Sequence, residues 1–117
     1  MLISYTFDEY QKLAARTINQ KMEDGEKELH ALHGLAGEVG EIHSLYQKVY
    51  QGHVMCNVDL IKEMGDLLWF IAELATANGL SLDEIAKANI QKLMKRYPDG
   101  FDADRSVNRE VYEGGQE

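Results

Sequence analysis

The sequence contains one proline and one cysteine, and each scarcity restricts what the protein can be. Pro98 is the only proline in 117 residues, so no proline interrupts a helix before that point. Cys56, standing alone, excludes a disulfide within the chain and a zinc site built from cysteines. A chain of this length buries only part of its apolar surface by itself. We therefore expect self-association.

Basic residues and long apolar runs are also scarce. Twelve Lys and Arg stand against twenty Asp and Glu, a net charge of −8, which argues against non-specific binding to nucleic acid or anionic membranes. No apolar run reaches the roughly 18 residues of a membrane span, and no signal segment is visible at the amino end. We therefore expect a soluble, cytoplasmic protein with no nucleic-acid or membrane partner. A phosphate ligand held by local cations or metal ions remains compatible with this charge.

Apolar periodicity and capping patterns predict four helices and no strands. Capping boxes open at Thr6 and Ser81, and helices end at Gly25, Gly52 and Gly79. The predicted helices cover about 7–22, 26–51, 57–78 and 82–96. The tail that follows is polar, with at most a short turn of helix. We expect one all-α domain over 1–117: a four-helix bundle with a short irregular carboxy-terminal tail, completed by oligomerisation.

Four carboxylates break the amphipathic pattern of the second and third helices. Glu38 falls inside the apolar arc with Glu41 at its edge, and Glu63 borders the next apolar stripe with Asp66 about 60° further round. Each pair is spaced i, i+3, so its carboxylates project from one face about one turn apart. If the helices pack together, four acids converge and repel unless cations neutralise them. Oxygen-only ligands favour Mg²⁺ or Mn²⁺; the alternative is a solvated acidic face with salt bridges.

Several glycines lie inside these same two helices. Each costs roughly 1 kcal/mol relative to alanine in a helix interior. The interior glycines are Gly34, Gly37, Gly40 and Gly65. They indicate either close helix packing or room for a bulky ligand.

The fourth helix places cations beside its apolar face. Asn89 falls within the apolar arc, and Lys92 and Arg96 line one flank of it. An amide and two cations near four acids suit a polyphosphate bridged by metal ions. The alternative is an amide satisfied in the core beside two cations that extend along the surface to water.

Trp69 and the four histidines are the other candidates. Trp69 lies nearly opposite the apolar stripe of the third helix, so we expect a second subunit or a nucleobase to cover it. None of the histidines follows a Glu by three residues, as carboxylate-bridged di-iron sites require. We interpret them as surface or supporting residues. They are His30, His33, His43 and His53.

Three segments together resemble the successive motifs of the MazG-like nucleoside triphosphate pyrophosphohydrolases, a family of the all-α NTP pyrophosphatase superfamily. The similarity covers roughly residues 26–100. The motifs are Gly37-Glu38-Val39-Gly40-Glu41-Ile42, then Lys62-Glu63-Met64-Gly65-Asp66-Leu67-Leu68-Trp69, then Ala88-Asn89-Ile90-Gln91-Lys92-Leu93-Met94-Lys95-Arg96-Tyr97-Pro98.

The resemblance implies an all-α dimer or larger homo-oligomer that cleaves nucleoside triphosphates between the α and β phosphates, with Mg²⁺ as cofactor and Mn²⁺ as a possible substitute. The products would be a nucleoside monophosphate and pyrophosphate. Many relatives carry a second Glu where this chain has Gly37, so the resemblance supplies no extra acid as general base. The metal ligands and catalytic acids it implies are Glu38, Glu41, Glu63 and Asp66, and the phosphate contacts are Asn89, Lys92 and Arg96.

The residue types also suggest a mechanism. Without a strong nucleophile, water attacks phosphorus directly, and one of the four acids, Glu41 for instance, orients or deprotonates it. Two alternatives stay open at this point. One is a non-catalytic helical module for interaction or oligomerisation, and the other is a relative dedicated to dUTP or phosphoribosyl-ATP.

Overall fold

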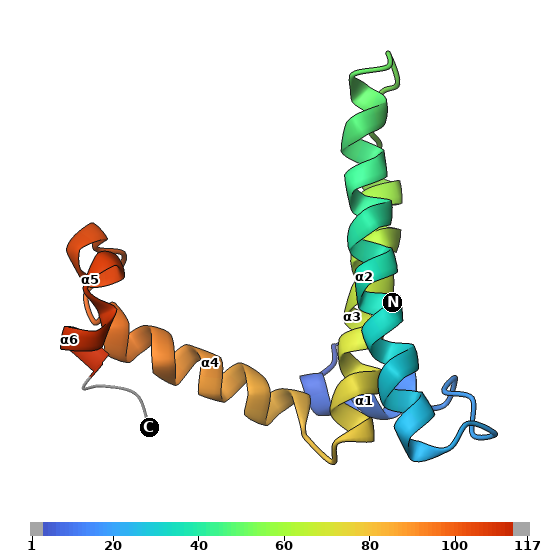
Figure 1. The fold of residues 1–117 in the computed structure, drawn as a ribbon, viewed down its shortest axis with the longest axis horizontal. Coiled ribbons are helices and arrows are strands. Elements are labelled where there is room, and N and C mark those ends of the chain that lie inside the picture. Colours follow the sequence, from blue (N-terminus) through green and yellow to red (C-terminus); the bar gives the residue numbers. More distant parts are fainter. Residues whose placement is uncertain (1–3, 114–117) are drawn as a thin grey trace. The chain divides into compact units, whose positions relative to one another are not determined.

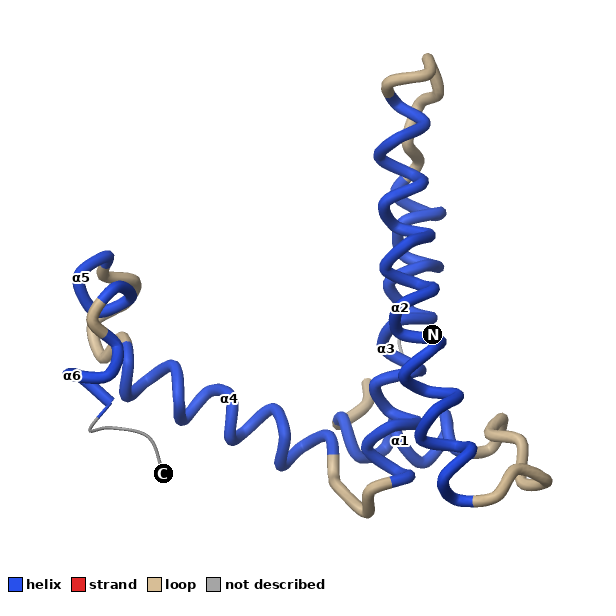
Figure 2. Tube along the Cα trace, viewed as in Figure 1, coloured by secondary structure: helices blue, strands red, loops and turns tan. Residues whose placement is uncertain are grey.

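The computed structural model describes residues 4–113, and within them every regular element is a helix. Figure 1 shows their order, and Figure 2 shows helices joined by short loops. The all-α prediction with four main helices is therefore confirmed. The helices are α1 (Phe7–Ala15), α2 (Asp24–Val49), α3 (Asn57–Ala77), α4 (Leu82–Arg96), α5 (Ala103–Val107) and α6 (Arg109–Glu113). The chain forms two compact units, Met1–Leu82 and Asp83–Glu117.

In the first unit, α2 and α3 lie side by side as an antiparallel pair, and α1 packs against the carboxy-terminal half of α3 (Figure 1). The buried core between α1 and α3 is small, with Tyr10 and Trp69 packed against it. Gln11 joins the two helices: its side-chain amide donates to the Thr76 hydroxyl at 3.0 Å and to the Leu80 carbonyl at 2.9 Å. The core residues are Ala14, Ala72, Ala75 and Leu82.

The first helix is shorter than the sequence predicts. The capping box at Thr6 is present, but α1 ends at Ala15 rather than near residue 22. The carbonyl of Ala14 accepts a tight-turn hydrogen bond from the Thr17 backbone N–H at 3.1 Å, and also accepts from the Thr17 hydroxyl at 2.9 Å and the Trp69 indole at 3.2 Å. Asp24 and Gly25, expected to end the helix, instead form the first turn of α2. A contact distant in sequence thus overrides the local pattern.

The later boundaries follow the glycine signals. Gly52 has a φ of 93° just after α2, and Gly79 has a φ of 66° just after α3. Both angles lie in the left-handed region that glycine adopts at little cost. The ends of α2 and α3 predicted at these glycines are therefore confirmed.

In the second unit, the tail folds back on the end of α4. Arg105 donates from its guanidinium to the carbonyls of Arg96 and Lys95, which are among the last in α4. The rings of Tyr97 and Phe101 lie 5.5 Å apart between centroids. The prediction of at most one short helical turn was wrong, because the tail forms both α5 and α6 and satisfies helix-end carbonyls.

The first unit leaves a band of large apolar side chains exposed along α2 and α3. Tyr46 is 50% exposed, Ile61 68% and Met64 55%. Burying such side chains against another surface is favourable. Among the described residues, no helix is both long and apolar enough to span a bilayer.

Candidate metal centre

Glu38 on α2 and Glu63 and Asp66 on α3 form a single group, which we call the acid cluster. Each carboxylate offers an oxygen within 4.8 Å of the others'. The antiparallel packing of α2 on α3 brings the two motifs together, as the sequence predicts for packed helices. Burial decreases from Glu38 and Glu63, which are partly buried, to Asp66, which is exposed. The cluster therefore opens to solvent on one side.

Within the acid cluster, Glu38 has a raised pKa and a carboxylate oxygen without a hydrogen-bond partner among the described residues. Loss of contact with water, a hydrogen bond with Glu63 and the charges of Asp66, Glu63 and Glu41 all raise the pKa of the Glu38 carboxyl. Its Oε2 is buried without a hydrogen-bond partner among the described residues. A buried oxygen that lacks a donor, beside two more carboxylates, is a ligand set for a hard divalent cation. The residues present therefore fit Mg²⁺ or Mn²⁺.

Glu41 is placed differently from the other three acids. It is exposed and does not belong to the group within 4.8 Å, although its charge acts on Glu38. On α1, burial and, to a lesser extent, the charge of Asp66 raise the pKa of the Tyr10 hydroxyl. The acid cluster itself thus consists of one carboxylate from α2 and two from α3.

Trp69 is covered by its own chain. Its indole nitrogen donates to the Ala14 carbonyl and, at 2.9 Å, to the Thr17 hydroxyl. Its ring stands edge-on to Phe70 at 5.1 Å. The face of α3 predicted to meet a subunit or a base is therefore packed in part by α1, and Trp69 stays partly exposed. A further contact of Trp69 with either partner stays a prediction.

The three polar residues of the third motif lie in the second unit. Asn89 and Lys92 are exposed, and Arg96 is partly buried. Arg96 also lies over the Tyr97 ring, 5.8 Å from its centroid. The apolar side chains beside Asn89 on α4 are exposed as well, Ile90 at 58%, so the placement of Asn89 in a core stays a prediction. Contact of these residues with phosphate stays a prediction.

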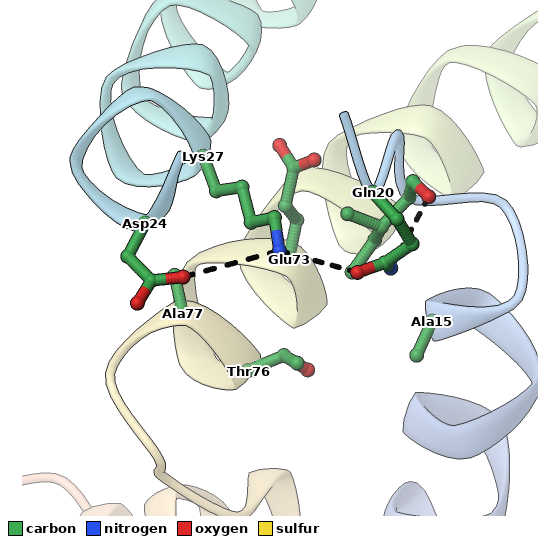
Figure 3. Close-up of a pocket in the computed structure, with 8 residues that line it drawn as sticks. Ala15, Gln20, Asp24, Lys27, Glu73, Thr76 and Ala77 are labelled. Carbon is green, nitrogen blue, oxygen red and sulfur yellow. Dashed lines mark hydrogen bonds and ion pairs between the residues drawn. The ribbon is translucent and has the colours of Figure 1, made fainter. Parts of the chain in front are cut away.

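Sequence reasoning missed a buried carboxylate outside the acid cluster. Glu73 of α3 is 1% exposed, and its Oε1 lies 2.7 Å from Nδ1 of His30 on α2. It forms one wall of a pocket of about 290 Å³ (Figure 3). The nearby ammonium of Lys27 is directed to Gln20 at 3.2 Å and Asp24 at 4.0 Å. The available signal was spacing: Glu73 follows Asp66 by seven residues, two helical turns along one face.

The fold and the site define an all-α protein in which three carboxylates from two antiparallel helices lie together. The chain belongs to the MazG nucleotide pyrophosphohydrolase family: the model of the MazG nucleotide pyrophosphohydrolase domain matches residues 26–101. The Gene 37 protein of Mycobacterium phage L5 is 32% identical over 81 residues, 65% of this chain and 71% of that protein. The uncharacterized protein YvdC of Bacillus subtilis strain 168 is 49% identical over 39 residues, 33% of this chain and 37% of that protein. No solved structure matches the chain significantly.

Proposed function

We propose that this protein is a Mg²⁺-dependent nucleoside triphosphate pyrophosphohydrolase that yields a nucleoside monophosphate and pyrophosphate. The observation that carries the proposal is the acid cluster within the family's matched region. Three acids that converge from two helices argue against a non-catalytic module, because like charges held together repel one another unless a cation offsets them.

Glu38, Glu63 and Asp66 would hold the metal, with Glu41 as an outer acid. Bound there, Mg²⁺ or Mn²⁺ would neutralise charge on the phosphates and polarise them toward attack. Glu38 keeps an oxygen free of protein donors, and its raised pKa reflects a site shaped for a positive charge. Glu41, exposed beside the cluster, is suited to orient an attacking water and accept its proton.

Asn89, Lys92 and Arg96 would bind the phosphates. Their spacing places them on one face of α4, and two cations there would offset charge that develops on the leaving pyrophosphate. The family match begins in α2 and continues through α4. This continuity supports one functional domain over residues 1–117.

We also propose that the protein acts as a homo-oligomer. The exposed apolar side chains along α2 and α3 lie close to the acid cluster in sequence, and Met64 stands between Glu63 and Asp66. A second copy of the chain would remove this surface from water.

The test is pyrophosphate release from the standard (d)NTPs, measured with Mg²⁺ and with excess EDTA. Wild type should release pyrophosphate only with the metal, and Asp66→Asn should reduce the rate at least a hundredfold. Asp24→Asn, an acid at the far end of α2, is the matched control and should retain wild-type turnover. Full activity in EDTA, or in Asp66→Asn, would contradict the assignment.

A further inference from the structure

Glu73 and His30 form a hydrogen-bonded pair between α3 and α2, outside the acid cluster. The carboxylate is almost completely buried, whereas the imidazole keeps 47% of its side-chain surface exposed. Their 2.7 Å contact joins Glu73 Oε1 to His30 Nδ1. The exposed partner is thus held in place by a buried one.

The contact engages Nδ1 of His30 and leaves Nε2 as the other ring nitrogen, whose role depends on the tautomer. We take Glu73 as ionised and His30 as neutral with its proton on Nδ1, the arrangement in which the carboxylate accepts the hydrogen bond across this contact. In the neutral imidazole, Nε2 is then an acceptor. The pair therefore presents one oriented acceptor on a ring whose rotation is restrained.

The pair lies on the same α2–α3 interface as the acid cluster. Glu73 is two turns beyond Asp66 on one face of α3, about 10 Å along the axis. Phe70 lies between Asp66 and Glu73 along α3, and the centre of its ring is 5.7 Å from the centre of the His30 ring. Trp69 meets the His30 ring edge-on at 6.5 Å. The rings of Phe70 and Trp69 and the Nε2 atom of His30 therefore lie about one nucleoside's length from the acid cluster.

We propose that His30, oriented by Glu73, recognises the nucleobase of the substrate by accepting a hydrogen bond at Nε2 from an exocyclic amino group. This inference rests on the proposed function, because it assumes that the triphosphate lies at the acid cluster. His30 is then a specificity-determining residue and Glu73 a positioning residue. The site favours a base with an amino group over the same base with a carbonyl, since a carbonyl oxygen opposite Nε2 leaves two acceptors facing each other.

The experiment compares kcat/KM for dCTP and dUTP, which differ in this substituent. Wild type should prefer dCTP by about tenfold. His30→Asn retains an amide that can donate to Glu73 but removes Nε2, so the preference should disappear while the protein stays folded. His30→Gln places a polar group near the position of Nε2 and should restore part of the preference.

Glu73→Gln tests the positioning role separately. A glutamine can donate as well as accept, so His30 is no longer held in one tautomer. The ratio of kcat/KM for dCTP to that for dUTP should therefore fall toward one. Glu28→Gln, an exposed acid on α2, is the control and should behave as wild type. Loss of stability in Glu73→Gln without a change in the ratio overturns the proposal.

The remaining outcomes distinguish a failure of the role proposed for His30 from a failure of the proposed function. If wild type and His30→Asn both release pyrophosphate with the same ratio of kcat/KM for dCTP to kcat/KM for dUTP, the role of His30 is overturned. The proposed function is then left intact. No release from any nucleotide overturns both. If the variants do not fold, the fluorescence of Trp69, the only tryptophan, should respond more strongly to dCMP than to dUMP in wild type. An equal response to both nucleotides contradicts the proposal.

Discussion

Gly34 of α2 lies directly against the ring of Phe70 on α3. A Cβ built on Gly34 would stand 2.1–2.5 Å from three carbons of that ring, whereas a Cβ at Gly37, Gly40 or Gly65 would meet nothing within 4 Å. Of the four interior glycines that the sequence singles out, Gly34 alone is required by helix packing within the subunit. The other three border the acid cluster or the exposed band, which is where a substrate or a second subunit would approach.

Gly34→Ala should destabilise the protein. The methyl group forces Phe70 from its position, and overpacking of this kind costs about 1–3 kcal/mol. Gly37→Ala is the matched control one turn along α2, and it should raise the free energy of unfolding by about 1 kcal/mol because alanine favours the helix. Urea denaturation followed by circular dichroism measures both. A Gly34→Ala protein as stable as Gly37→Ala would contradict the packing described.

The stability of the metal-free protein should depend on the protonation of Glu38. Because folding raises the pKa of this carboxyl, the folded state binds more protons than the unfolded chain between the ordinary and the raised values. The contribution of Glu38 to the free energy of unfolding therefore falls as pH rises through that window. Glu38→Gln should flatten the pH dependence there and leave neutral-pH stability unchanged or higher.

Thermal unfolding between pH 4 and 8, in EDTA, measures this effect, with Glu28→Gln as the control for an exposed acid of α2. Turnover should be lost in Glu38→Gln although the fold persists. Unfolding of Glu38→Gln at neutral pH would indicate a structural role in place of metal binding.

Trp69→Ala should destabilise the subunit itself. The partly buried indole packs against the α1–α3 core and donates to Ala14 and Thr17. Truncating a fully buried tryptophan costs about 3–5 kcal/mol, so the loss at Trp69 should lie at or below the lower end of that range. Trp69→Phe keeps most of the packing and removes the donor, so it should lose about 1 kcal/mol. Chemical denaturation gives both values, and sedimentation shows whether assembly also changes. Unaltered stability in Trp69→Ala would leave only the subunit or nucleobase contact.

Much of the fold could be predicted because its signals are local. The Thr6 capping box, the glycines after α2 and α3, and the apolar spacing of the helices act within a few residues. The end of α1 could not be predicted in this way, since it depends on Trp69, 55 residues from Ala14. The tail likewise folds because Arg105 reaches carbonyls at the end of α4.

In the candidate site too, the residues with a local sequence signal could be predicted and those that depend on a distant partner could not. The spacing of Glu38, Glu63 and Asp66 is enough to predict their convergence once the helices pack. Glu73 was overlooked because its significance lies in its partner, and nothing in sequence spacing links it to His30 across 43 residues. Oriented histidines of this kind become visible only when both helices are in place.

The central claim is the cleavage between the α and β phosphates, and ³¹P NMR of the reaction products tests it most directly. With Mg²⁺, a nucleoside triphosphate should give rise to signals of the nucleoside monophosphate and pyrophosphate alone, and Asp66→Asn should leave the triphosphate intact. Appearance of a nucleoside diphosphate with orthophosphate, or equal turnover in the presence of excess EDTA, would contradict the account.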